Sequence, residues 1–268
     1  MGYQISELRI GGILDQAITL LKNHIGLLLG VTLVLLIPYS LVQNFVNLAI
    51  APQLPEDATF QDELAFQSEF AKTSWITIPM ALIAVYIVVP ITNAAIIHAV
   101  SSEYLEKPTT VGKAMQRAIQ MIMPLLWTWF LQILAIVVGL FLCIIPGILF
   151  AFWFALSSQV VVIEGTSGIA ALQRSRQLMT GNIGTVFVLG ILVGSIQWGI
   201  TLSSAALNLQ QHIQVIGQVF AGAIVTIFAA VAFVVFYFSC LCKLENFDLS
   251  LLAQSVGIEA AADDAFEE

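Results

Sequence analysis

The sequence is short of charge, and it lacks charge altogether over one long stretch. Only 10% of its 268 residues are Asp, Glu, Lys or Arg, whereas soluble domains average about 25%. None of the four occurs between Ala118 and Ile163, a run of roughly 46 residues that is too long for one membrane span of about 20 and fits two. Pro146-Gly147 is the strongest turn signal in the run. The run therefore predicts a membrane hairpin.

The apolar segments also lack the residues that most transport and catalytic mechanisms use. Ionisable residues are costly inside a membrane and usually serve a purpose there. Here no acid, Lys or Arg lies in an apolar segment away from its ends, and the three histidines are too scattered to form a ligand set. The chain has no glycine-rich phosphate-binding loop, no His-Glu-x-x-His zinc motif, no Gly-x-Ser-x-Gly nucleophile elbow and no pair of carboxylates placed for catalysis. We therefore predict no catalytic residue, no metal, no cofactor and no enzyme activity.

The chain has few cysteines, and its acidic residues are confined to a few segments. Cys143, Cys240 and Cys242 lie in or at the end of apolar segments, where a free cysteine behaves as a small hydrophobic residue, so no disulfide framework is implied. The acids gather in residues 51–74 and at the C-terminus, and we predict that residues 253–268 form an acidic, disordered tail. Neither acidic segment has the basic and aromatic content that nucleic-acid binding needs, so nucleic acid is excluded as a partner.

Charge-free windows predict six transmembrane helices in an all-α membrane domain over residues 1–252. Each window is near the length that crosses a hydrocarbon core of about 30 Å. A polar stretch at residues 208–214 divides the last long run into two helices joined by a loop. The predicted spans are 25–50, 75–100, 121–144, 147–163, 183–206 and 216–242.

The basic residues predict which ends of the spans face the cytoplasm. Eight of the nine precede span one, lie between spans two and three or four and five, or follow span six. Those segments share one side of the membrane, and the opposite segments hold only Lys72. Because Lys and Arg are enriched in cytoplasmic loops, both termini are predicted to be cytoplasmic.

Three short amphipathic segments precede spans one, three and five. In the first, Ile13, Leu14 and Ala17 share one helical face, and Asp15 and Lys22 lie on the other. The recurrence predicts three parallel repeats, each an interfacial helix followed by a hairpin. Basic residues on the polar faces suit anionic lipid headgroups, although we favour the simpler alternative that they only determine topology. These candidate headgroup contacts are Lys22, Lys113, Arg117, Arg174 and Arg176.

Uncharged polar residues remain inside the spans, and four of them bear on function. They are Asn93, Gln132, Gln159 and Gln197. Such groups form hydrogen bonds between helices worth about 0.6–2 kcal/mol, and they can equally line a polar path. We favour the first interpretation. A structure separates the two, because paired groups leave a dry interior and a path leaves a cavity.

Two blocks of sequence resemble a bacterial membrane-protein family. One runs through Ile145-Pro146-Gly147-Ile148, residues 160–165 and residues 171–181, and the other is Glu245-Asn246-Phe247-Asp248-Leu249. They resemble the membrane domain fused to some glycerophosphoryl diester phosphodiesterases, and related stand-alone inner-membrane proteins of unknown function. The resemblance implies an all-helical module of the bacterial inner membrane. It implies no hydrolysis, because the phosphodiesterase barrel is absent from this chain.

The resemblance also singles out a set of motif residues. Glu164 and Arg174 are its charged positions, and we expect them to pair and to fix the third amphipathic segment on the bundle. The chain departs from the family at residues 239–241, where the family commonly has an Asp-Leu-Arg type sequence. The motif candidates are Pro146, Gly147, Glu164, Gly165 and Arg174.

The sequence as a whole predicts a non-enzymatic integral membrane protein. Its expected role is that of a scaffold, or of a membrane-organising or regulatory module. The alternative is a transporter or channel for a small molecule or a lipid. The expected partners are membrane lipids, and self-association or other membrane proteins are further candidates.

Overall fold

The computed structural model is all-helical over the residues that it describes, which are 8–50, 60–105, 109–206 and 211–245. The predicted tail, residues 253–268, lies outside them. A π-helical turn, η1 (Ala84–Val88), joins α2 to α3. The α-helices in the described ranges are α1 (Ile10–Ile50), α2 (Phe60–Ile83), α3 (Val89–Tyr104), α4 (Val111–Gln120), α5 (Ile122–Leu142), α6 (Ile144–Trp153), α7 (Ser157–Glu164), α8 (Ile169–Met179), α9 (Ile183–Ala206) and α10 (Gln211–Glu245).

Six helical stretches in the described ranges are long and apolar enough to cross a membrane. This confirms the all-α class and indicates a multi-pass membrane protein. The stretches are Ile10–Gln43, Ala71–Tyr104, Ile122–Leu142, Ile144–Glu164, Ile183–Ser203 and Phe220–Leu244.

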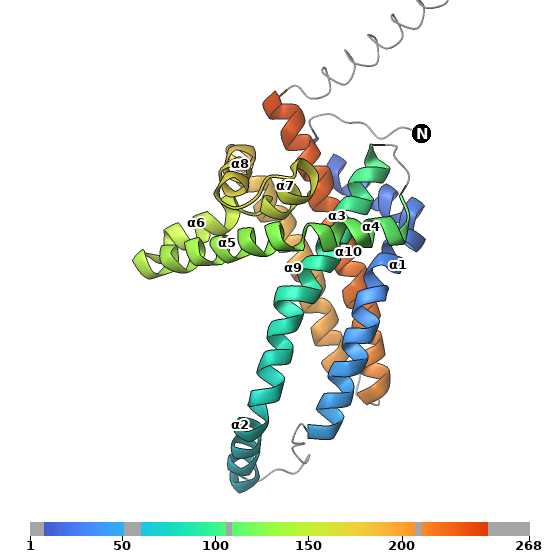
Figure 1. Ribbon diagram of the computed structural model, residues 1–268, viewed down its shortest axis with the longest axis vertical. Coiled ribbons are helices and arrows are strands. Elements are labelled where there is room, and N and C mark those ends of the chain that lie inside the picture. Colours follow the sequence, from blue (N-terminus) through green and yellow to red (C-terminus); the bar gives the residue numbers. More distant parts are fainter. Residues whose placement is uncertain (1–7, 51–59, 106–108, 207–210, 246–268) are drawn as a thin grey trace, which may run out of the picture.

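Helix α10 is the centre of a bundle that runs along the long axis of the molecule (Figure 1). It packs against α1, α3 and α9. Residues 230–242 of α10 are buried almost without interruption, and the ring of Phe238 stacks on that of Tyr104 in α3 at a centroid distance of 5.1 Å. Small residues of α3, Ala94, Ala95 and Ala99, are fully buried and allow the close helix approach on which packing in lipid depends. The core therefore lies along α10.

The α5–α6 hairpin leaves this bundle sideways and lies across its long axis (Figure 1). Its two helices are packed against each other at a pair of glycines. A Cβ atom on Gly147 would lie 2.7 Å from the backbone nitrogen of Leu140, and one on Gly139 would lie 2.9 Å from the Cα of Gly147. Only glycine at both positions permits this contact between backbones.

The structure corrects the predicted turn of this hairpin. The chain reverses at Cys143, whose backbone is extended, and not at Pro146-Gly147. Pro146 instead lies in the first turn of α6, where the missing N–H of proline costs no helical hydrogen bond. A proline followed by glycine therefore marked the start of a helix here, and the predicted boundaries at 144 and 147 were a few residues late.

The fourth predicted span, 147–163, lies within the apolar stretch Ile144–Glu164, but the chain forms two helices there and not one. Between α6 and α7 the helix is interrupted, and Ser175 of α8 binds both sides of the interruption. Its hydroxyl donates to the carbonyl oxygen of Trp153 at 2.8 Å and accepts from the backbone N–H of Leu156 at 3.2 Å. Buried backbone groups need such partners, so a contact from a distant helix stabilises the break.

Replacing Ser175 with alanine should lower the free energy of unfolding by about 1.5 kcal/mol, because it leaves backbone groups of Trp153 and Leu156 without their partner in a buried place. Unfolding by SDS in mixed micelles would measure the change. Ser203→Ala is the matched control, since the hydroxyl of Ser203 is exposed and bonds only within its own helix. An unchanged Ser175→Ala protein would mean that the break does not depend on this hydroxyl.

The three segments expected to be amphipathic are helical, but the structure does not confirm that they begin three like units. A kink at His24 separates residues 10–23 from the rest of α1, and His24 Nδ1 lies 3.3 Å from Glu103 Oε2 of α3. The segment buries Ile13 and Ala17 and exposes Lys22. The hairpins after the first and third segments follow the long axis, whereas the middle hairpin crosses it (Figure 1). The threefold repeat stays a prediction.

Candidate binding cavity and the ion pair beside it

A cavity of about 590 Å³ lies among α3, α7, α9 and α10. Both α3 and α9 pack against α10, but they are not among the helix pairs in close contact within the described residues. The cavity occupies the space between them. Its lining residues are Val89, Asn93, Ile97, Ala155, Ser158, Gln159, Gly190, Val193, Gly194, Gln197, Val225, Thr226, Ala229, Ala230 and Phe233.

Three of the four polar residues singled out from the sequence line this cavity, each from a different helix or its start. Gln197 of α9 is exposed, Asn93 of α3 is half-buried, and Gln159 of α7 is only 6% exposed. The amides thus extend from an accessible position to a buried one. The Oε1 atom of Gln159 is buried and has no hydrogen-bond partner within the described part of the chain. A buried amide oxygen without a partner costs about 1–3 kcal/mol and is uncommon in folded proteins.

Gln132 is the fourth, and it does not line the cavity. Its Oε1 accepts a hydrogen bond of 2.6 Å from the hydroxyl of Ser157, which joins α5 to α7. Beside it, Trp129 donates from Nε1 to the hydroxyl of Ser158 at 3.0 Å. Gln132 is therefore paired between helices, which is the arrangement that the sequence alone favoured for all four residues.

The cavity offers hydrogen bonds but no charge. Its lining contains no Asp, Glu, Lys, Arg, His or Cys, and the apolar residues Val89, Ile97, Val193 and Phe233 form much of its wall. An ion would enter without a counter-charge, at a cost that low-dielectric surroundings make large. The lining fits an uncharged molecule with an apolar body and a polar group that forms hydrogen bonds with amides such as those of Asn93 and Gln197.

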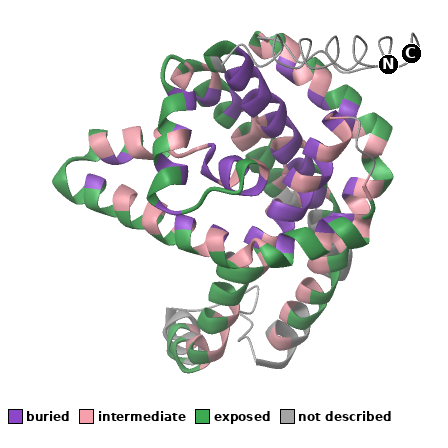
Figure 2. Ribbon diagram, turned by 45° about the horizontal axis from the view of Figure 1, so that its top comes forward, coloured by how far each residue is buried: buried purple, intermediate pink, exposed green. Residues whose placement is uncertain are grey.

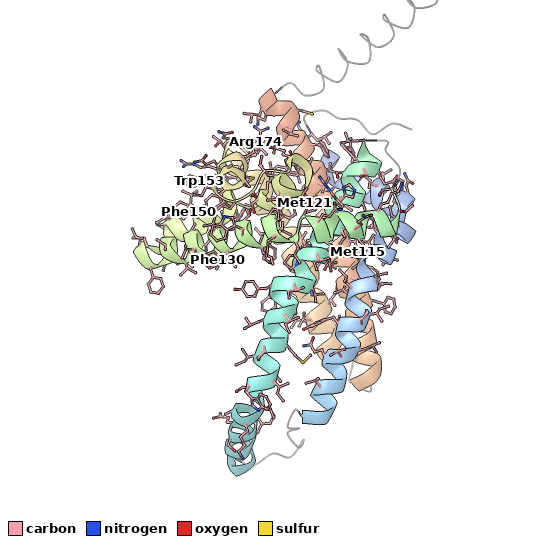
Figure 3. The ribbon with its side chains drawn as sticks, in the orientation of Figure 1. Met115, Met121, Phe130, Phe150, Trp153 and Arg174 are labelled. Atoms are coloured by element: carbon pink, nitrogen blue, oxygen red, sulfur yellow. The ribbon has the colours of Figure 1, made fainter. Side chains whose placement is uncertain are left out.

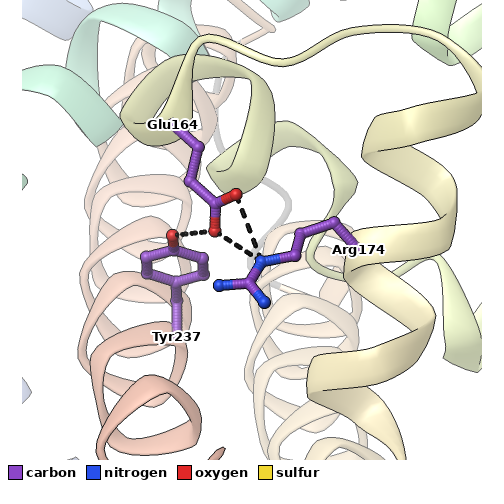
Figure 4. A network of polar contacts seen from close by, with 3 residues as sticks. All are labelled: Glu164, Arg174 and Tyr237. Carbon is purple, nitrogen blue, oxygen red and sulfur yellow. Dashed lines mark hydrogen bonds and ion pairs between the residues drawn. The ribbon is translucent and has the colours of Figure 1, made fainter. Parts of the chain in front are cut away.

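A second polar cluster joins α7, α8 and α10 (Figure 4). Arg174 Nε lies 3.0 Å from Glu164 Oε1 and 3.2 Å from Oε2, and the hydroxyl of Tyr237 donates to Oε1 at 2.7 Å. Gly165 ends α7 in the left-handed region, at φ 74°, where glycine is favoured, and so begins the loop that returns α8 toward Glu164. The two charged residues expected to pair are thus in contact.

Glu164→Gln should destabilise the protein by about 1 kcal/mol, because it removes the charge from both hydrogen bonds while 22–23% of each side chain of the ion pair stays exposed to solvent screening. Tyr237→Phe should cost a similar amount, and the double variant should cost less than the sum. Unfolding in mixed micelles would measure all three. Lys22→Gln, at an exposed site, is the control. Additive losses would contradict the coupled cluster.

The remaining motif residues are not gathered at this cluster. Pro146 and Gly147 lie near the Cys143 turn, where α6 begins, whereas Glu164 and Gly165 lie where α7 ends. Two parts of the motif, residues 160–165 and 171–181, meet beside the α7–α8 loop. The third part, residues 145–148, lies near the turn of the α5–α6 hairpin.

The five candidate headgroup residues have different surroundings. Lys22, Lys113 and Arg117 are exposed. The guanidinium of Arg176 stacks over the ring of Trp153 at 4.2 Å, and Arg174 is engaged by Glu164. We call the end of the molecule that carries α4, α8 and the end of α10 the basic end. Figure 3 shows Arg174 and Trp153 there and Phe130 on the hairpin.

Several residues of these sites could not be identified from the sequence. Tyr237, Thr226 and Ser158 carry no local signal, because a single hydroxyl in an apolar helix is common and most such groups bond within their own helix. Their role depends on which helices meet, and that is a property of the fold.

The sequence matches no family model, no curated protein and no solved structure. The resemblance to the membrane domain of glycerophosphoryl diester phosphodiesterases therefore stays an expectation from sequence motifs.

Proposed function

We propose that this protein is a non-enzymatic integral membrane protein that binds an uncharged amphiphilic molecule in the cavity among α3, α7, α9 and α10. The observation that carries the proposal is Gln159, which lines the cavity and whose buried Oε1 has no hydrogen-bond partner within the described part of the chain. A turn of the Gln159 side chain toward the cavity would bring this oxygen within reach of a ligand hydroxyl or amide N–H. This favours the transporter or carrier alternative over a purely structural scaffold, which would have its amides paired as Gln132 is.

The volume and the lining of the cavity support a ligand of this size and polarity. A volume of about 590 Å³ lies within the range of ligand sites, roughly 300–1,000 Å³. Gln197 and Asn93 add hydrogen-bonding groups at membrane depth, where a polar group without a partner is costly. A neutral lipid or another uncharged amphiphile with a free hydroxyl has the required chemistry.

The proposal includes a location and an orientation. The basic end faces the cytoplasm, both termini lie on that side of a bacterial inner membrane, and the six apolar helices lie within the bilayer. The amphipathic segments lie at the interface, where their basic residues meet anionic headgroups. Lipids are the principal partners, and self-association is compatible with the exposed apolar surfaces.

A binding experiment with two probes tests this function. Monooleoylglycerol has free hydroxyls and methyl oleate has none, so only the first should raise the unfolding temperature of the purified protein. Gly194→Phe should remove the effect, because Gly194 lines the cavity and a Cβ there meets nothing within 4 Å. Gly199→Phe is the matched control, since Gly199 has equal room but does not line the cavity. Equal stabilisation of all three proteins would contradict the proposed site.

A further inference from the structure

The α5–α6 hairpin carries no charge, and the large side chains that it exposes are apolar. No charged residue lies between Ile122 and Ile163, and large apolar side chains are exposed along both helices. The exposure is greatest at the tip, where Phe141 is 88% exposed and Ile145 is 79% exposed. Figure 2 shows the hairpin as mostly exposed or intermediate, in contrast to the buried centre of the bundle. The exposed surface is suited to lipid chains, whereas one side of α5 packs on α7 and carries the hydrogen-bonding residues Trp129 and Gln132.

The hairpin is not aligned with the helices that run along the long axis. It lies across that axis and leaves the bundle near the basic end, between α4 and α8 (Figure 1). The 24 residues of α9 have a length of about 36 Å along that axis, enough for a hydrocarbon core of about 30 Å. If these helices cross the membrane, the hairpin lies parallel to its plane.

The dimensions of the hairpin fit one leaflet. A helix with its side chains is about 10–12 Å thick, and half of the hydrocarbon core is about 15 Å. An amphipathic helix would stay at the headgroup level, but one whose exposed surface is apolar has no polar face to keep there. The turn suits this depth, because the N–H of Cys143 donates to the Gly139 carbonyl at 3.0 Å and Pro146 has no N–H to satisfy.

We propose that the α5–α6 hairpin is embedded in the acyl chains of the leaflet at the basic end and does not cross the membrane. Its occupants are lipid chains, and the exposed Lys113, Arg117 and Arg176 on the flanking helices lie beside the headgroups of that leaflet. Four helical segments then cross, and both termini remain on one side. The hairpin adds volume to one leaflet only, which makes it a wedge. This inference is independent of the cavity and its ligand.

Labelling of the native Cys143 tests the inference, and it needs no substitution in the hairpin. It is the exposed cysteine at the tip, whereas Cys240 and Cys242 are buried. In membrane vesicles of each orientation, a charged maleimide that cannot cross the bilayer should fail to label Cys143 from either face. Labelled with a fluorophore by a lipid-soluble maleimide, Cys143 should be quenched by lipids that carry a nitroxide on the acyl chain. Lys72→Cys and Lys113→Cys, in a Cys143→Ala background, mark the two faces as accessible controls.

Each other outcome would overturn the inference. Labelling of Cys143 from the face that exposes Lys72→Cys would mean that the hairpin crosses the membrane. Labelling from the Lys113→Cys face would mean that the tip lies in water. Absence of lipid quenching together with crosslinking of Cys143 between two chains would mean that a second copy covers the hairpin. Protection from both faces with strong acyl-chain quenching is the result that the proposal requires.

Discussion

Replacing Gln159 with methionine should make the protein more stable and less able to bind. Methionine is similar in size and has no polar atom that needs a partner, so removal of the unpaired Oε1 should raise the free energy of unfolding by about 2 kcal/mol. The same change removes the acceptor for the ligand. Binding of monooleoylglycerol should weaken at least about tenfold, which corresponds to about 1.4 kcal/mol.

Gln132→Met is the matched comparison, and its effect on stability should have the opposite sign. Gln132 accepts a hydrogen bond from Ser157, so its loss leaves that hydroxyl unpaired and should lower the free energy of unfolding by about 1 kcal/mol. Because Gln132 does not line the cavity, binding should change little. Unfolding in mixed micelles and probe titration would measure both variants. A destabilised Gln159→Met protein would show that the Gln159 amide stabilises the packing of the helices, which would contradict a role in ligand binding.

Gly147→Leu should detach α6 from α5. The Cβ atom of any larger residue would lie 2.7 Å from the backbone nitrogen of Leu140, and backbone cannot move aside as a flexible side chain can. Overpacking of this kind costs about 1–3 kcal/mol, and a value near about 3 kcal/mol is expected where backbone faces backbone. Unfolding in mixed micelles would measure the loss.

Two further variants make the Gly147 experiment specific. Gly139→Leu should have a similar effect, because Gly139 faces Gly147 across the hairpin. Gly184→Leu should be nearly neutral, since a Cβ there meets nothing within 4 Å. If Gly147→Leu is as stable as Gly184→Leu, the two helices of the hairpin are not packed through these glycines.

The membrane character and the helices of this fold could be predicted from the sequence, because lipid imposes length and apolarity on whatever lies within it. Charge-free windows found six apolar stretches, including the two that make up the 118–163 run. The turn in that run was misplaced because Pro146-Gly147 is a turn signal in most contexts, whereas here proline begins a helix and glycine serves helix contact. Proline and glycine report a local preference, and contacts across the hairpin decide how it is used.

The break between α6 and α7 had no local signal. Residues 154–156 contain no proline or glycine, and the break depends on Ser175, which lies 19 residues beyond Leu156 in sequence. The crosswise hairpin was unpredictable for a related reason. A helix without charged residues carries no clear amphipathic pattern, so its sequence does not encode how it lies in the membrane.

The candidate site was predicted in its residue types and not in its arrangement. The sequence singles out Asn93, Gln132, Gln159 and Gln197, because amides are few inside the spans. It does not reveal that three of these residues line a cavity and that Gln132 forms a hydrogen bond between helices, since both depend on which helices meet. The Glu164–Arg174 contact was expected from the resemblance, because these are the charged positions of the matching sequence block and carry opposite charges.

The central claim is that the cavity holds an uncharged amphiphile, and the intact mass of the protein released from native membranes tests it most directly. The wild-type protein should carry a bound neutral molecule in stoichiometric amount, Gly199→Phe should retain it, and Gly194→Phe should lose it. A wild-type protein that carries no such molecule, or an adduct that persists in Gly194→Phe, would contradict the account.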